Sequence, residues 1–128
     1  MSVVGLGVDL ADTARIRSLL ERNGERFKAR VFTAGESAYC DGCADPTLHY
    51  TARFAAKEAA AKALGTGFAD GVSWLDIEVV REPSGAPRIL LHGGASRKAE
   101  ELGVHKVLLS LTHTEAAAAA AVVMLGGS

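Results

Sequence analysis

The chain has 128 residues, a length that fits one domain with its own core. Its formal charge of -1 argues against a general nucleic-acid binder, and its 48% hydrophobic and 5% aromatic content indicates a globular protein with a core of aliphatic residues and alanine. No apolar run approaches the length of a membrane span, and Met1 leads into a strand-like segment instead of a charged signal peptide. With two cysteines and no export signal, we expect a cytoplasmic protein.

Residues 3–10 alternate in a way that predicts a strand. One face carries Val4, Leu6, Val8 and Leu10, and the other carries Val3, Gly5, Gly7 and Asp9. The glycine face is bare, which allows a neighbouring backbone or a ligand to come close. Asp9 ends this face, and two interpretations are open at this point: a turn or helix-cap residue, or a functional carboxylate.

Residues 13–33 have a helical pattern with a break near Asn23-Gly24. The segment carries six basic residues against two acidic ones, a net +4, whereas the rest of the chain carries -5. A solvated face is the ordinary explanation for such a run. Aromatic and aliphatic side chains, Phe27 among them, are interleaved with the charges, which favours a surface that binds an anionic protein.

Residues 35–43 predict a short helix, followed by a loop at 41–46. Cys40 and Cys43 form a single Cys-x-x-Cys, whereas a structural zinc ion needs four ligands. The four histidines are not spaced to complete such a site, and no strand leads into the motif as in redox proteins. We therefore expect neither zinc binding nor redox chemistry from this pair.

The centre of the chain, residues 52–67, is rich in alanine and predicts a helix that Gly65 and Gly67 end. Alanines gather on one side of the helical wheel, which suits close packing of the helix backbone against another element. The members of this side are Ala52, Ala55, Ala56, Ala59 and Ala63. The opposite side carries Tyr50, Phe54, Lys57, Glu58, Ala61 and Lys62, with Arg53 at its edge.

Two interpretations of that charged side are possible. Glu58 and Lys62 have the spacing of a surface ion pair, which stabilises a helix by a few tenths of a kcal/mol. Aromatic residues among the charges favour instead the floor of a cleft. One carboxylate among three cations suits a phosphate ligand bound together with a metal ion.

The rest of the chain predicts a sheet domain. After a loop at 68–73 we expect a hairpin, made of a strand at 74–81, a turn at 82–87 and a strand at 88–92. A helix at 94–103 and a strand at 106–113 follow. Residues 115–125 contain alanines that favour a helix, but a preceding hydroxyl-rich turn and Val122-Val123 favour a returning strand, which we predict. We expect one α+β domain over 1–128, with a mostly antiparallel sheet packed against a long central helix.

Three motifs resemble a known family. They are Gly7-Val8-Asp9, the run Arg-Phe-Ala-Ala-Lys-Glu-Ala at 53–59 with Lys-Ala-Leu-Gly-Thr-Gly at 62–67, and Ser-Leu-Thr-His-Thr at 110–114. In order and spacing they resemble holo-acyl-carrier-protein synthase, a short bacterial 4′-phosphopantetheinyl transferase. The resemblance covers nearly the whole chain and is weakest at 41–48. It implies the fold of this family and the transfer of the 4′-phosphopantetheine arm of coenzyme A to a serine of apo acyl carrier protein, with release of 3′,5′-ADP.

The resemblance also implies roles for individual residues. Asp9 and Glu58 match the ligands of a catalytic Mg²⁺, while Lys57 and Lys62 match cations near the pyrophosphate. We include Lys62 with the two carboxylates as a catalytic residue. The coenzyme-binding residues are expected to be Arg53, Lys57, Lys62, Gly65, Thr66, Ser110 and His113. The base that accepts the serine proton is not identified: a metal-bound water, a carboxylate and His113 are all possible. For His113 itself, the alternative interpretation is a histidine that faces the core.

The short enzymes of this family are trimers with active sites at subunit interfaces, so the resemblance implies a homotrimer. It also implies an acidic partner, and we expect Arg15, Arg26 and Arg30, with Phe27 as an apolar anchor, to dock the carrier protein. Two other classes compete. A non-catalytic module that binds carrier protein or coenzyme A would lack the paired carboxylates, and a structural domain with incidental charges would not combine three motifs.

Overall fold

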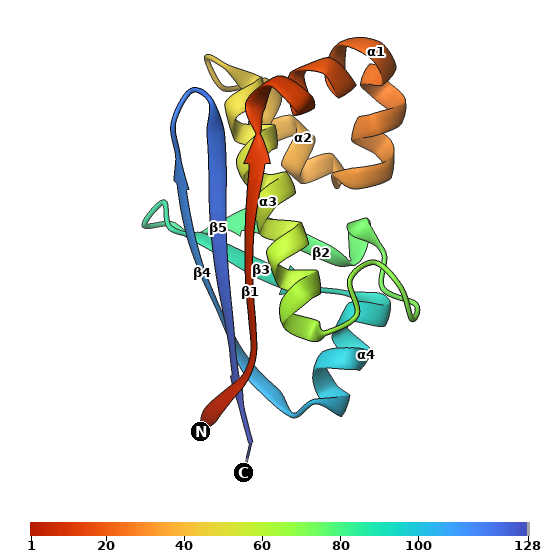
Figure 1. Cartoon of the computed structure of the whole chain (residues 1–128), viewed down its shortest axis with the longest axis vertical. Helices are drawn as coiled ribbons and strands as arrows, with labels where there is room; N and C mark the ends of the chain where they lie inside the picture. The colour runs from red at the N-terminus through yellow and green to blue at the C-terminus, as the bar shows by residue number, and fades with distance from the viewer. Residues whose placement is uncertain (128) are drawn as a thin grey trace.

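The computed structural model describes residues 1–127, which fold into a main sheet, a separate hairpin and the helices that pack beside them (Figure 1). In chain order the elements are β1 (Ser2–Asp12), α1 (Thr13–Val31), α2 (Ala34–Asp41), α3 (Pro46–Leu64), a 3-10 helix η1 (Trp74–Asp76), β2 (Ile77–Arg81), β3 (Pro87–Leu91), α4 (Gly93–Glu101), β4 (Val104–His113) and β5 (Ala117–Gly126). The α+β class and the long helix against an antiparallel sheet are confirmed. Within residues 1–127, no helix combines the length and apolarity needed to cross a membrane.

The main sheet has the strand order β1-β5-β4, and both pairings are antiparallel. The predicted final strand is confirmed, because β5 is the central strand of this sheet. The hairpin β2-β3 is a separate two-stranded sheet. Helix α3 lies against the main sheet, with α1 and α2 beside its N-terminal half and α4 near its C-terminal end (Figure 1).

The contact between β1 and α3 is made without intervening side chains. A Cβ atom at Gly7 would overlap the carbonyl oxygen of Ala59, and one at Gly5 would overlap that of Ala63. The bare face of the strand therefore receives the alanine side of the helix, as both patterns predict. We call these four residues the glycine seam. It fixes how closely the end of β1 approaches the middle of α3.

The opposite face of the main sheet is uncovered in the single chain. Leu6, Val8 and Leu10 on β1 are between 60% and 70% exposed, and Leu108 on β4 is 42% exposed. Pairing with β5 sets Leu6 and Leu108 opposite the same residue, Val123. We call this apolar surface the outer face. Large apolar side chains gathered on one exposed face are typical of an interaction surface.

Helix α1 is divided at Gly24, whose backbone leaves helical geometry with φ 3° and ψ -92°. The predicted break is thereby confirmed. The segment after the break packs on the rest of the helical layer, since the Phe27 ring meets Phe32 edge-on at 5.6 Å and the Phe54 ring at 6.4 Å. Lys28 reaches Asp41 at the end of α2 with an Nζ to Oδ1 distance of 3.3 Å.

Two predicted element starts differ from the structure by three residues or more. Helix α3 begins at Pro46, six residues before the predicted start, because proline suits the first helical position, and Asp45 stands before it without a side-chain cap hydrogen bond. The predicted strand at 74–81 begins only at Ile77. Its first three residues form η1, closed by a hydrogen bond that the Ser73 N–H donates to Asp76 Oδ2 at 3.1 Å.

Candidate active site

Three predicted site residues meet where the glycine seam ends. Asp9 lies near the end of β1, and Lys62 Nζ is 3.2 Å from its Oδ1. Lys62 also donates a hydrogen bond to the backbone oxygen of Val8 at 3.0 Å. Glu58 lies one turn earlier on α3, and its pKa is raised by partial burial and by the negative charge of Asp9. The structure therefore brings the two carboxylates and one lysine into one cluster.

Arg15, near the start of α1, also belongs to this neighbourhood. Its guanidinium lies over the Phe54 ring at 5.4 Å from the centroid. The positive charges of Lys62 and Arg15 act on Glu58 and partly oppose the rise in its pKa. Arg15 therefore lies beside the carboxylates as well as at the start of the basic segment.

The donor set of this cluster fits Mg²⁺ bound together with a phosphate ligand. Among residues 1–127, no group of three or more His, Cys, Asp or Glu side chains is placed to hold a metal ion. Magnesium commonly takes one or two carboxylates and completes its octahedron with water and phosphate oxygens. Asp9 and Glu58 match that requirement, whereas they would make an incomplete cage for a structural zinc ion.

Lys57 does not lie in this cluster, which corrects the expectation that it faces the pyrophosphate. Its Nζ is 2.7 Å from Glu36 Oε1, and both side chains are fully buried. The ammonium also donates to the backbone oxygens of Trp74, at 3.1 Å, and Ile77. Burial lowers the pKa of Lys57, and the charge of Glu36 opposes that shift. All three protons of the ammonium are thus directed to groups inside the protein.

Glu36 is bonded as completely as its partner. Its carboxylate accepts hydrogen bonds from the N–H groups of Thr33, at 2.8 Å, and Val79, at 2.7 Å. The Thr33 bond is half of a capping box at the start of α2. The Glu36–Lys57 pair therefore joins α2, α3 and β2 one residue before Glu58.

A second cationic group lies around Tyr39. The guanidinium of Arg53 is 4.4 Å from the centre of the Tyr39 ring and that of Arg81 is 5.0 Å from it, while the His49 ring meets it edge-on at 5.7 Å. Burial lowers the pKa of His49, and the positive charges of Arg53, His113 and Arg81 add to that effect. We call these five residues the tyrosine cluster.

Arg53 has an unsatisfied donor in this cluster. The side chain is only 5% exposed, and its Nε, within the described chain, has no hydrogen-bond partner. A buried guanidinium N–H without an acceptor is costly, and a phosphate oxygen would satisfy it. Sequence reasoning identified Arg53 and His113 but missed Tyr39, His49 and Arg81, which converge from α2, α3 and β2 only in the folded chain.

His113 and Ser110 do not meet Asp9 within one chain. They lie on β4, which is separated from β1 by β5. His113 is exposed, so the alternative of a core-facing histidine is wrong. Ser110 is also exposed, and strand alternation places it with Leu108 on the outer face.

The turn after α3 is less open than its glycines suggested. Gly65 and Gly67 adopt positive φ values of 80° and 57°. Their N–H groups donate to the carbonyl oxygens of Lys62 and Ala61, at 2.9 and 3.1 Å. The sequence predicted that the backbone N–H groups of this turn face a phosphate, but these two already donate to carbonyl oxygens of α3. Thr66 is therefore the residue of this turn that stays a candidate for the coenzyme site.

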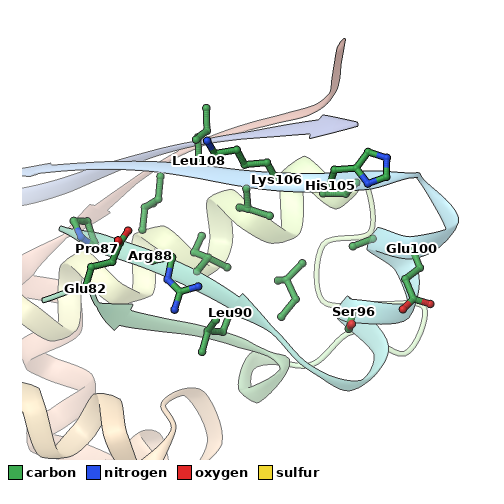
Figure 2. Close-up of a pocket in the computed structure, with 15 residues that line it drawn as sticks. Glu82, Pro87, Arg88, Leu90, Ser96, Glu100, His105, Lys106 and Leu108 are labelled. Atoms are coloured by element: carbon green, nitrogen blue, oxygen red, sulfur yellow. The ribbon is translucent and has the colours of Figure 1, made fainter. Parts of the chain in front are cut away.

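The remaining predicted partner residues lie on one surface. Arg26, Phe27 and Arg30 line a hollow of about 440 Å³ together with Leu19 and Asn23. Arg15 does not line it. A larger groove of about 600 Å³ separates β3 and α4 from β4, with Arg88 and Leu90 on one side and Lys106 on the other (Figure 2). That groove contains none of the predicted site residues.

The cysteines are both free thiols. Cys40 is buried, and burial raises the pKa of its thiol to about 12. Cys43 donates a hydrogen bond to the Tyr39 carbonyl oxygen at 3.3 Å. At neutral pH Cys40 is therefore protonated, which is unfavourable for nucleophilic or metal-binding chemistry.

Comparison with known proteins decides the family. Residues 5–123 match the family model of the 4′-phosphopantetheinyl transferase superfamily. The chain belongs to this superfamily. It is 50% identical over 122 residues to the holo-[acyl-carrier-protein] synthase of Solibacter usitatus, covering 95% of this chain and 98% of that protein. This phosphopantetheinyl transferase is therefore an enzyme of the holo-[acyl-carrier-protein] synthase group.

Solved structures agree with the fold of this phosphopantetheinyl transferase. The holo-[acyl-carrier-protein] synthase of Neisseria meningitidis is similar with a TM-score of 0.89 and 33% identity, covering 96% of this chain and 98% of that one. The Bacillus anthracis synthase, solved in complex with CoA (3′,5′-ADP), has a TM-score of 0.82 and 33% identity, covering 99% of this chain and 100% of that one.

Proposed function

We propose that this phosphopantetheinyl transferase transfers the 4′-phosphopantetheine arm of coenzyme A to a serine of apo acyl carrier protein, with Mg²⁺, and releases 3′,5′-ADP. The meeting of Asp9, Glu58 and Lys62 at the end of the glycine seam carries the proposal. The names of the relatives and the coenzyme complex of the Bacillus anthracis protein support it. The two free thiols suit a reducing cytoplasm, which we include in the proposal.

In this reaction the serine oxygen bonds to the phosphorus that carries the pantetheine arm, and the bond from that phosphorus to the bridging oxygen of 3′,5′-ADP breaks. Asp9 and Glu58 would hold Mg²⁺, which neutralises pyrophosphate charge when bound. Lys62 supplies a positive charge beside the leaving phosphate. The serine proton needs an acceptor, and the carboxylate pair and His113 of a neighbouring copy are the candidate groups of the protein.

The direct test incubates the protein with apo acyl carrier protein, coenzyme A and Mg²⁺ and measures the mass of the carrier protein. The expected result is the addition of one phosphopantetheine arm. A protein that binds coenzyme A without modifying the carrier would be the non-catalytic module. Absence of both binding and transfer would leave only a structural domain.

We also propose that two copies of the chain form each active site. Arg53 and Glu58 are five residues apart, which places them about 140° apart around α3 at about 100° per residue. The tyrosine cluster and the carboxylate cluster consequently face different directions within one chain. A neighbouring copy can bring its Arg53 and His113 to the coenzyme while Asp9 and Glu58 hold the pyrophosphate.

The outer face supplies a surface for that assembly, and we propose a homotrimer. Covering the exposed leucines and valine of β1 removes apolar area from water, the main driving force for association. Sedimentation equilibrium should give three times the chain mass of 13.3 kDa. A monomer at micromolar concentration that is fully active would contradict the shared site.

We propose that the basic segment docks the acidic carrier protein through Arg15, Arg26 and Arg30, with Phe27 as the apolar contact. Arg26→Glu is expected to raise the KM for carrier protein several-fold and to weaken its dependence on salt, because exposed charges act mainly on encounter and are screened beyond about 8–10 Å. Affinity for coenzyme A should stay the same. Steady-state kinetics between low and physiological salt, with calorimetry for coenzyme A, measure both.

Arg97→Glu on α4 is the matched control for this charge reversal, since Arg97 is also an exposed helical arginine but lies outside the basic segment. It should leave the KM for carrier protein near that of the parent. If Arg26→Glu weakens coenzyme A binding as much as it weakens carrier protein binding, the residue serves the coenzyme site or the fold and the docking proposal fails.

A further inference from the structure

Three aromatic rings are stacked along one side of α3. The ring centroids of Phe54 and Trp74 are 4.9 Å apart with an interplanar angle of 29°, and those of Trp74 and Phe68 are 3.8 Å apart at 17°. Phe54 is buried, whereas Trp74 and Phe68 are partly exposed. We call these three residues the aromatic wall. Both Trp74 and Phe68 pack against the buried core and keep part of their surface open to solvent.

The aromatic wall adjoins the carboxylate cluster. Phe54 precedes Glu58 by four residues, so the two side chains are neighbours on one face of α3. Arg15 links them as well, because it lies over the Phe54 ring and its charge acts on Glu58. The segment after α3 turns back beside the helix and brings Phe68 and Trp74 to this position (Figure 1).

The buried lysine holds the wall in place. Lys57 donates a hydrogen bond to the Trp74 carbonyl oxygen at 3.1 Å while it is paired with Glu36. This contact fixes the backbone of η1 against α3 immediately before Glu58. The backbone that carries the Trp74 ring is therefore held by the ion pair that immediately precedes Glu58 on the helix.

We propose that the aromatic wall binds the pantetheine arm of coenzyme A, an inference that rests on the proposed function. The arm starts at the phosphate that is transferred, so its first carbon atoms must lie beside Asp9 and Glu58. Those atoms carry a gem-dimethyl group, and two amide groups follow before the thiol. The partly exposed surface of Trp74 and Phe68 suits both the methyl groups and the amide groups, because it can bury apolar area without requiring a fixed polar partner.

The nucleotide end of the coenzyme has different requirements. Its phosphate groups are anionic and suit the tyrosine cluster, where Arg53 and Arg81 gather. The aromatic wall should therefore contribute to binding of coenzyme A and of 4′-phosphopantetheine but not to binding of 3′,5′-ADP. This difference between three available compounds makes the assignment testable.

Trp74 is the single tryptophan of the chain, so the unmodified protein reports on the wall. Titration with coenzyme A or 4′-phosphopantetheine in Mg²⁺ should shift the tryptophan emission to shorter wavelength, because the arm shields the indole from water. Titration with 3′,5′-ADP should leave the emission unchanged, while calorimetry on the same samples shows that the nucleotide is bound. An equal shift with 3′,5′-ADP, or no shift on saturation with coenzyme A, would overturn the proposal.

Variants provide an independent measurement. Trp74→Ala should weaken binding of coenzyme A about 10-fold, which corresponds to roughly 1.4 kcal/mol, and leave affinity for 3′,5′-ADP unchanged. Trp74→Phe should restore most of the loss. Leu75→Ala is the matched control, because Leu75 belongs to the same short helix but lines a different hollow, beside Lys28 and Phe32.

These outcomes separate the inference from the function on which it rests. If the parent protein modifies carrier protein and Trp74→Ala still binds coenzyme A normally, only the proposal that the aromatic wall binds the pantetheine arm is refuted. A parent protein that binds neither compound and transfers nothing would refute the proposed function. Thermal unfolding of Trp74→Ala and Trp74→Phe shows whether a loss of binding follows from unfolding, in which case 3′,5′-ADP binding would fall as well and the proposal would fail.

Discussion

Glu58→Gln is expected to reduce transfer of the phosphopantetheine arm at least about 100-fold and to leave the protein folded. The substitution keeps the shape of the side chain but removes the negative charge that would hold Mg²⁺ opposite Asp9. Stabilisation by a metal ion contributes several kcal/mol in reactions of this kind, and each 1.36 kcal/mol corresponds to about a factor of ten in rate. Transfer is measured by the mass of carrier protein, and Mg²⁺ binding by calorimetry in the presence of 3′,5′-ADP.

The control for this substitution is Glu101→Gln on α4, which removes a mostly exposed carboxylate that is paired with Lys98 at 3.9 Å. Its activity should equal that of the parent. Near-normal transfer by Glu58→Gln at limiting Mg²⁺ would show that this carboxylate is not a metal ligand. Because Glu58 is only partly buried and its pKa is raised by burial and by Asp9, removing its charge should not unfold the chain.

The second large effect is expected on stability. Lys57→Met should lower the free energy of unfolding by about 3–5 kcal/mol, because it leaves the Glu36 carboxylate buried without its cation. Glu36→Leu should cost a similar amount by isolating the lysine. The double variant should lose less than the sum of the two single losses, since it buries neither charge, although the backbone groups that both side chains bonded are left unpaired. Urea unfolding of the four proteins gives the coupling free energy directly.

Lys98→Met is the control for this cycle, since it breaks an exposed pair between Lys98 and Glu101 that contributes at most about 1 kcal/mol. If the losses of unfolding free energy in Lys57→Met and Glu36→Leu simply add in the double variant, the two side chains are not coupled. The hydrogen bonds of Lys57 to Trp74 and Ile77 would then account for its effect.

Much of the fold follows from local sequence signals. Alternation along β1, the alanine stripe on α3 and the glycine at the end of that helix each correspond to one structural element. The errors lie where a short-range cap outweighs a longer pattern. Asp45 and Pro46 start α3 early, and Ser73 with Asp76 closes a 3-10 turn inside an apparently alternating segment.

The candidate site was predictable only in part. Asp9 and Glu58 were identified from motifs, and the structure brings them together through backbone contact at the glycine seam. Lys57 was misplaced because a helical wheel shows which side a residue occupies but not what covers that side. Glu36 lies 21 positions earlier, and no periodicity connects the two. The same reason explains why Tyr39 and Arg81 were missed.

The glycine seam has a mechanical consequence for the carboxylate pair. Because two backbones touch there, main-chain geometry sets how closely the backbone of Asp9 approaches that of Glu58. Two like charges are thus brought near each other by folding, and the Lys62 ammonium, 3.2 Å from Asp9 Oδ1, offsets part of their repulsion. A divalent cation bound by both carboxylates, as proposed above, would relieve the remaining repulsion without requiring the two backbones to move.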